Sequence, residues 1–225
     1  MAGEGAPPSL VRVWDIPVRA GHWLVVALVA FSWLSAKEGW IGWHKVSGYA
    51  ILTFVLFRVY WGFAGSSTAR FSHFLKGPKA VGRYIRTFFS RRDYAASLGH
   101  NPLGGWSIIA MLVLLALQTG LGLFSVDEYG IEGGPLATYV SFDTGRQIAG
   151  WHATVFNLLL FFIALHVAAI TIYLLFKREN LVAPMLTGSK STVENDATLS
   201  FATAKRALGA IVVSVAFVAA VVFFF

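Results

Sequence analysis

The 225-residue chain is 56% hydrophobic and 15% aromatic, and only 13% of its residues are charged. A soluble domain carries roughly a quarter of charged residues, so the composition excludes that class and indicates an all-α integral membrane protein. The absence of cysteine excludes disulfides, thiolate zinc sites, cysteine-ligated iron–sulfur clusters and covalently attached c-type haem.

Five apolar segments are predicted to cross the membrane, at about 20–36, 43–63, 105–124, 148–176 and 207–225. About twenty polar and mixed residues precede the first, so we expect a retained helix and not a cleaved signal peptide. The fourth exceeds the ~20 residues that a bilayer needs and is expected to tilt or protrude. These segments predict a transmembrane domain over 1–180, a cytoplasmic linker over 181–204, solvated at 187–200, and a C-terminal transmembrane helix over 205–225.

Lysine and arginine are unevenly distributed between the connections. The connections 64–104 and 177–206 are basic, and the N-terminal segment contributes Arg12 and Arg19, whereas 37–42 and 125–147 together hold two cations, Lys37 and Arg146, against five carboxylates. The positive-inside rule therefore predicts a multi-pass protein of the bacterial inner membrane with a cytoplasmic N-terminus. The net charge of +7 then reflects topology, and nucleic acid is not an expected partner.

The basic stretch 69–92 alternates cations with large apolar residues. This pattern is typical of an amphipathic helix lying in the lipid headgroup layer, so membrane lipid is an expected partner. His73 and His100, in the same connection, are expected to be ordinary surface or interface residues.

Four other histidines lie in or at the edges of predicted spans: His22, His44, His152 and His166. His152 and His166 are fourteen residues apart, so they share a helix face and are separated by about 21 Å along the axis. Because successive spans run in opposite directions, His22 is expected at the cytoplasmic depth of His166, and His44 at the periplasmic depth of His152. A single such histidine is more often a satisfied polar residue, but four in two pairs favour a cofactor.

Two imidazoles that face each other at each depth could serve as the two axial ligands of a haem iron. A tetrahedral zinc site needs four ligands, so each pair would be two ligands short. Two haem b groups are therefore predicted. Arg19 and Arg58 could bind the propionates of the inner haem and Lys45 those of the outer one, although snorkelling at the interface explains these cations equally well. Gly48, four residues after His44, could let the macrocycle approach the backbone or could serve helix packing. Gln118 and Asn157 are expected to form interhelical hydrogen bonds.

Several motifs together resemble the prokaryotic cytochrome b561 family, which is akin to the b-type cytochrome subunits of nickel–iron hydrogenases and formate dehydrogenases. They are WDIPVRAGHW (14–23), HKVSGY (44–49), RVYWGFAG (58–65), ARF (69–71), GHNPLGG (99–105) and the spacing of His152 and His166. The resemblance covers about residues 10–180. It implies a four-helix transmembrane bundle in which His22, His44, His152 and His166 bind two b haems, with the fifth helix as an addition.

The resemblance also implies electron transfer between a membrane quinone and a redox partner protein, such as a cytochrome c or a dehydrogenase- or hydrogenase-type subunit. Arg19, Arg58, His100 and Asn101 form one candidate quinone site. A self-sufficient oxidoreductase using a small donor such as superoxide is the alternative. No nucleophile or acid–base set marks a site for it, so the sequence does not decide between the two. A haem-free metal or proton transporter is disfavoured because few polar residues line the spans. A homo-oligomer is compatible with the sequence.

Overall fold

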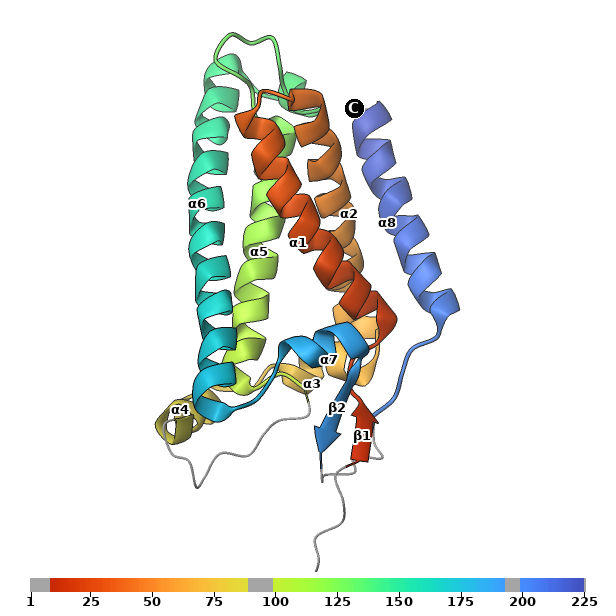
Figure 1. Ribbon diagram of the computed structural model, residues 1–225. Coiled ribbons are helices and arrows are strands. Elements are labelled where there is room, and N and C mark those ends of the chain that lie inside the picture. Colours follow the sequence, from red (N-terminus) through yellow and green to blue (C-terminus); the bar gives the residue numbers. More distant parts are fainter. Residues whose placement is uncertain (1–8, 89–98, 193–198, 225) are drawn as a thin grey trace, which may run out of the picture.

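The computed structural model describes residues 9–88, 99–192 and 199–224 and shows five long apolar helices. Four of them form an antiparallel bundle and the fifth lies outside it (Figure 1). The bundle helices are α1 (Ile16–Lys37), α2 (Ile41–Ala64), α5 (Pro102–Phe124) and α6 (Phe142–Ile172), and the outer helix is α8 (Ala204–Phe224). The predicted fold class, a four-helix bundle with a fifth C-terminal helix, is confirmed.

The helix boundaries follow local sequence signals. Asp15 caps α1, its carboxylate accepting a 2.8 Å hydrogen bond from Val18 N, and Pro17 occupies the first turn, so the helix begins four residues before the predicted span. Gly39 lies in the short turn before α2 and has φ +71°. Only glycine adopts this left-handed backbone conformation at little cost. Because that turn is short, α1 and α2 are antiparallel neighbours.

Short elements lie at the two ends of the bundle, and each end has its own set. The basic end carries β1 (Ser9–Arg12), α3 (Phe71–Phe74), α4 (Pro78–Phe88), α7 (Val182–Thr187) and β2 (Ser189–Thr192), as Figure 1 shows. The acidic end carries the turn 38–40 and the loop 125–141, which contains a 3-10 turn at Ala137–Tyr139. Charge thus divides between the ends as the sequence predicts.

Two segments differ from the sequence-based expectation. The single amphipathic helix expected over 69–92 is broken at 75–77, before Pro78, into α3 and α4, while 89–92 lie outside the described residues. The expected solvated linker over 187–200 begins with β2, which pairs antiparallel with β1 in the register Ser9↔Thr192 to Arg12↔Ser189. The pairing closes because Gly188, at φ +88°, ends α7 and accepts hydrogen bonds from Val13 N and Trp14 N.

Apolar side chains fill the middle of the bundle, between its two ends. Leu159 of α6, only 2% exposed, packs with buried residues of α2 and α5: Ile51, Val55, Leu112, Leu114 and Leu115. Helix α8 buries small residues against Phe57 and Trp61 of α2, namely Ala207 and Ala210. Small residues let helices approach closely inside lipid, where no hydrophobic force drives them together.

Candidate functional site

One face of α6 carries functional groups at heptad intervals. His152, Leu159, His166 and Tyr173 follow each other every seven residues and therefore point in nearly the same direction. The helix is continuous α from Phe142 to Ile172 and then widens into a π turn over Tyr173–Lys177. His152 and His166 consequently lie about 21 Å apart along the axis, with the buried Leu159 between them.

At the acidic end, the imidazoles of His44 and His152 face each other from α2 and α6. Their ring centroids are 6.1 Å apart and the rings are nearly perpendicular. His44 Nδ1 lies 2.9 Å from the carbonyl oxygen of Ser32 and 3.1 Å from its hydroxyl. His152 Nδ1 lies 2.9 Å from the carbonyl oxygen of Gln118. A carbonyl can only accept, so each Nδ1 carries the proton and each Nε2 presents a lone pair.

Gln118 contacts the second nitrogen of His152 as well. Its side-chain Nε2 lies 2.9 Å from His152 Nε2, while its Oε1 is buried without a hydrogen-bond partner. The interhelical role predicted for Gln118 is therefore confirmed. Asn157 is exposed on the outside of α6, so the same role predicted for it is wrong.

At the basic end, His22 of α1 faces His166 of α6. Their ring centroids are 6.4 Å apart with an interplanar angle of 55°, and Trp23 meets the edge of His22 at 4.9 Å. His22 Nδ1 is buried and has no hydrogen-bond partner among the described residues. The structure thus brings the four histidines together as the two pairs that span direction predicts. Carbonyls of the described residues hold the acidic-end pair but not the basic-end one.

Buried polar atoms without hydrogen-bond partners cluster at the basic end. Four of the five in the described part of the chain belong to groups there: Arg19 Nε, His22 Nδ1, Arg58 Nη1 and His100 Nδ1. Native proteins satisfy nearly all buried polar atoms, so such a cluster calls for an explanation. All four atoms are nitrogens, and those of the two arginines carry positive charge, so an anionic oxygen-bearing group would satisfy them.

The two predicted cations of this end differ in their surroundings. Arg58 is only 8% exposed, and its guanidinium lies 5.5 Å from the centre of the Phe71 ring. Arg19 already donates from Nη1 to the carbonyl of Leu186, which anchors α7 over the start of α1. Arg58 is therefore the more completely buried cation, and Arg19 is shared with the α7 segment.

His100 is half-buried at a contact between chain segments, which agrees with the interface location that was one of the two expected for it. Its ring sits 4.5 Å from that of Trp14 and 5.0 Å from that of Phe74. Burial lowers the pKa of His100 to about 3, helped by the positive charge of Arg58 and by His166 and His73, so the imidazole is neutral. His73, by contrast, is exposed on α3 as expected.

The remaining predicted residues are placed as follows. Lys45 forms an ion pair with Glu132 of the 125–141 loop, so its charge is already partnered. A Cβ at Gly48 would meet nothing within 4 Å, which leaves open space one turn beyond His44.

Asn101 caps α5 by accepting a hydrogen bond from Gly104 N at 2.7 Å, and it donates one to the hydroxyl of Tyr173 at 2.7 Å. Asn101 is thus already engaged by Tyr173, and the quinone site of Arg19, Arg58, His100 and Asn101 stays a prediction.

Ser32 and the carbonyl of Gln118 are site groups that the sequence did not reveal. Backbone carbonyls carry no residue signature, and a serine in an apolar helix has many ordinary roles. Within the described residues no three His, Asp or Glu side chains gather as a metal cluster. The histidines can therefore act as axial pairs but not as a tetrahedral protein site.

Comparisons with known proteins agree with this arrangement. Residues 13–188 match the family described as prokaryotic cytochrome b561. A probable Ni/Fe-hydrogenase B-type cytochrome subunit of Rhizobium leguminosarum bv. viciae is 24% identical over 216 residues, covering 80% of this chain and 88% of that protein. A protein of the same description from Azotobacter chroococcum mcd 1 is 24% identical over 211 residues, with the same coverage. No solved structure matches the chain.

Proposed function

Because the chain belongs to the prokaryotic cytochrome b561 family, a family of membrane electron-transfer proteins with b-type haem, we propose that it carries electrons across the membrane through two b haems. The electrons pass between a membrane quinone and a redox partner protein. The observation that carries this proposal is the presence of two separate histidine pairs at opposite ends of one bundle. When bound, haem b at each pair supplies reversible one-electron chemistry at iron.

The spacing within each pair would allow its two imidazoles to hold one metal ion between them. Two metal–imidazole bonds of about 2 Å, plus roughly 1 Å from each bonding nitrogen to its ring centre, give a centroid separation of roughly 6 Å. The measured separations of 6.1 and 6.4 Å agree with that sum. We assign His44 and His152 to the acidic-end haem and His22 and His166 to the basic-end haem.

Hydrogen bonding orients the acidic-end ligands. The carbonyls of Ser32 and Gln118 hold the Nδ1 protons of His44 and His152, which fixes the tautomer and leaves Nε2 for iron. The Gln118 amide, which contacts His152 Nε2, has to turn aside for that nitrogen to bind a metal. Open space at Gly48 suits the approach of a flat macrocycle.

The unpartnered nitrogens of the basic end suit haem propionates. Arg58 and Arg19 supply charge, and His100 Nδ1 supplies a further polar contact that the sequence did not single out. Lys45 pairs with Glu132, so the outer site would have less cationic compensation than the inner one. The apolar middle of the bundle around Leu159 excludes water between the two sites.

The topology and the partners complete the proposal. We place the basic end and the N-terminus in the cytoplasm of a bacterium with this protein in its inner membrane, because the basic connections cluster there. The division into a di-haem domain (1–180), a connecting segment (181–204) and a C-terminal helix (205–225) remains a prediction. The relatives are described as hydrogenase cytochrome subunits, so a hydrogenase-type subunit is the first partner to test.

A reduction assay separates a relay from a self-sufficient oxidoreductase. The purified chain should show a b-type reduced-minus-oxidised spectrum, and a quinol should reduce its haem without a second protein. If the chain turns over quinone with superoxide alone at a sustained rate, the self-sufficient alternative replaces the relay. If folded chain shows no haem spectrum, both readings fail and a haem-free role must be considered.

A further inference from the structure

Helix α4 presents all its cations on one side. At about 100° per residue, Lys79, Arg83 and Arg86 fall within about 60° of each other around the axis. All three are exposed, as is Lys76 just before the helix. Neither of the two ion pairs found among the described residues includes any of these four cations.

The opposite side of α4 is apolar and fixed to the bundle. Tyr84 hydrogen-bonds through its hydroxyl to the hydroxyl of Tyr173, and the ring of Phe88 meets that of Tyr173 edge-on at 5.6 Å. Lys177, the last residue of the π turn after α6, lies 5.1 Å from the centre of the Phe88 ring. The cationic side must therefore point away from the bundle.

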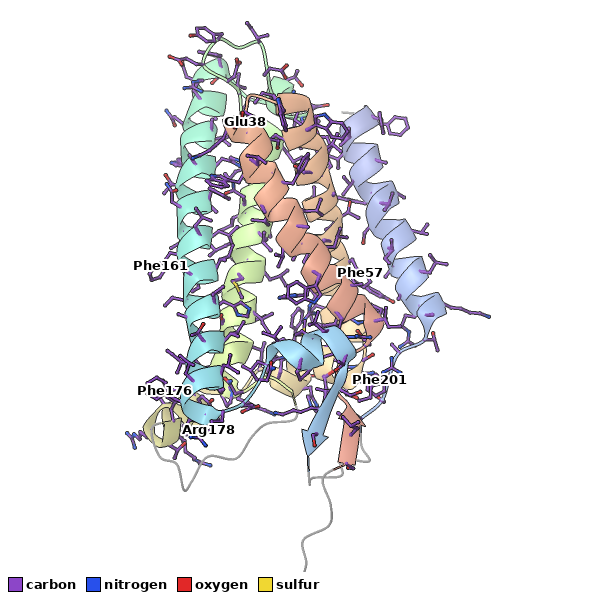
Figure 2. All side chains as sticks on the ribbon, viewed as in Figure 1. Glu38, Phe57, Phe161, Phe176, Arg178 and Phe201 are labelled. Carbon is purple, nitrogen blue, oxygen red and sulfur yellow. The ribbon has the colours of Figure 1, made fainter. Side chains whose placement is uncertain are left out.

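The depth of α4 is set by the end of α6. Leu174, Leu175 and Phe176 are exposed there, on the outside of the helix that Tyr173 joins to α4. Figure 2 shows Phe176 and Arg178 at this end of α6, beside α4. Exposed apolar side chains of this size belong in hydrocarbon, so α4 lies where hydrocarbon gives way to headgroups.

Charge complementarity identifies the occupant of this surface. The sequence contains no aspartate or glutamate from Gly39 to Arg92, so no carboxylate lies within α4 or in the stretch that precedes it. We propose that the surface formed by Lys76, Lys79, Arg83 and Arg86 binds the phosphate of anionic phospholipids in preference to zwitterionic ones. A lipid phosphate is the anion available at this depth, and a cation close to an anionic bilayer gains affinity from it.

The test uses the full-length chain in neutral detergent with its haem bound. Short-chain phosphatidylglycerol, short-chain phosphatidylcholine, inorganic phosphate and an octaglutamate peptide are titrated separately, and binding is followed by native mass spectrometry. Phosphatidylglycerol alone should bind tightly. The triple variant K79Q/R83Q/R86Q should weaken that binding on the order of 100-fold, since each cation contributes roughly fivefold.

Matched variants separate charge from folding. The charge-preserving variant K79R/R83K/R86K should retain phosphatidylglycerol binding, and Lys205→Gln, which removes an exposed cation from α8 at the same end, should leave it unchanged. If the triple glutamine variant is unstable, Arg83→Gln alone should weaken binding about fivefold. Equal binding of both lipids, or unchanged binding by the glutamine variants, overturns the proposal. Equal binding of phosphate or octaglutamate overturns the assignment to lipid.

Discussion

Replacing His44 by alanine should remove one haem and leave the other nearly unchanged. His44 serves only the acidic-end pair, and its partner His152 lies about 21 Å along α6 from His166. Sites separated by more than about 10 Å normally act independently. A unit charge at about 21 Å with an effective dielectric constant of about 20 is worth about 0.8 kcal/mol, or about 35 mV.

The assay combines haem content per chain with a redox titration of the α-band. His44→Ala should halve the haem content and shift the midpoint potential of the remaining haem by less than about 35 mV. His152→Ala should leave the same remaining spectrum, whereas His22→Ala and His166→Ala should leave the complementary one. His73→Ala, at an exposed histidine of α3, is the matched control and should change neither quantity. Loss of both haems from a folded His44→Ala chain, or of neither, would refute the pairing.

Three further predictions concern groups around the pairs. Arg58→Gln removes a buried cation that would stabilise the reduced basic-end haem. For a charge at about 8 Å, the midpoint potential of that haem should fall by up to about 90 mV in a redox titration. An unchanged potential would show that Arg58 does not lie near the haem. Ser32→Ala removes the hydroxyl 3.1 Å from His44 Nδ1 and keeps the carbonyl. The acidic-end haem should therefore be retained, and its midpoint potential should rise by no more than about 40 mV. Loss of that haem would show that the hydroxyl is essential. Because burial lowers the pKa of His100 to about 3, this residue binds a proton only in the unfolded chain between about pH 6.5 and 3. The melting temperature should therefore fall as the pH is lowered through that range, and His100→Phe should flatten the decline. An unaltered slope would contradict the burial of the ring.

The histidine pairs could be found from the sequence because two simple regularities determine them. Fourteen residues are close to four helical turns, so His152 and His166 share a face, and alternating span direction fixes the depths of His22 and His44. Both regularities survive errors of several residues in the helix ends. Helix α1 begins at Ile16, earlier than expected, yet His22 still lies opposite His166.

The surroundings of the pairs could not be found in this way. His100 is half-buried because Trp14 and Phe74 pack against it from segments away from it in the chain, and no local pattern encodes such a contact. The β1–β2 pairing joins two short strands, SLVR and SKST, across more than 170 residues, and neither strand has an alternating apolar pattern. The break before α4 was more accessible, since Gly77 and Pro78 mark it in the sequence.

The most direct test of the account is the haem content of the purified, folded chain, measured as pyridine haemochrome per mole of protein. The two histidine pairs predict two b haems per chain, and each would be low-spin if both imidazoles of its pair bound the iron. A folded chain that is colourless, or that holds a single haem however it is loaded, would contradict the proposed path for electrons.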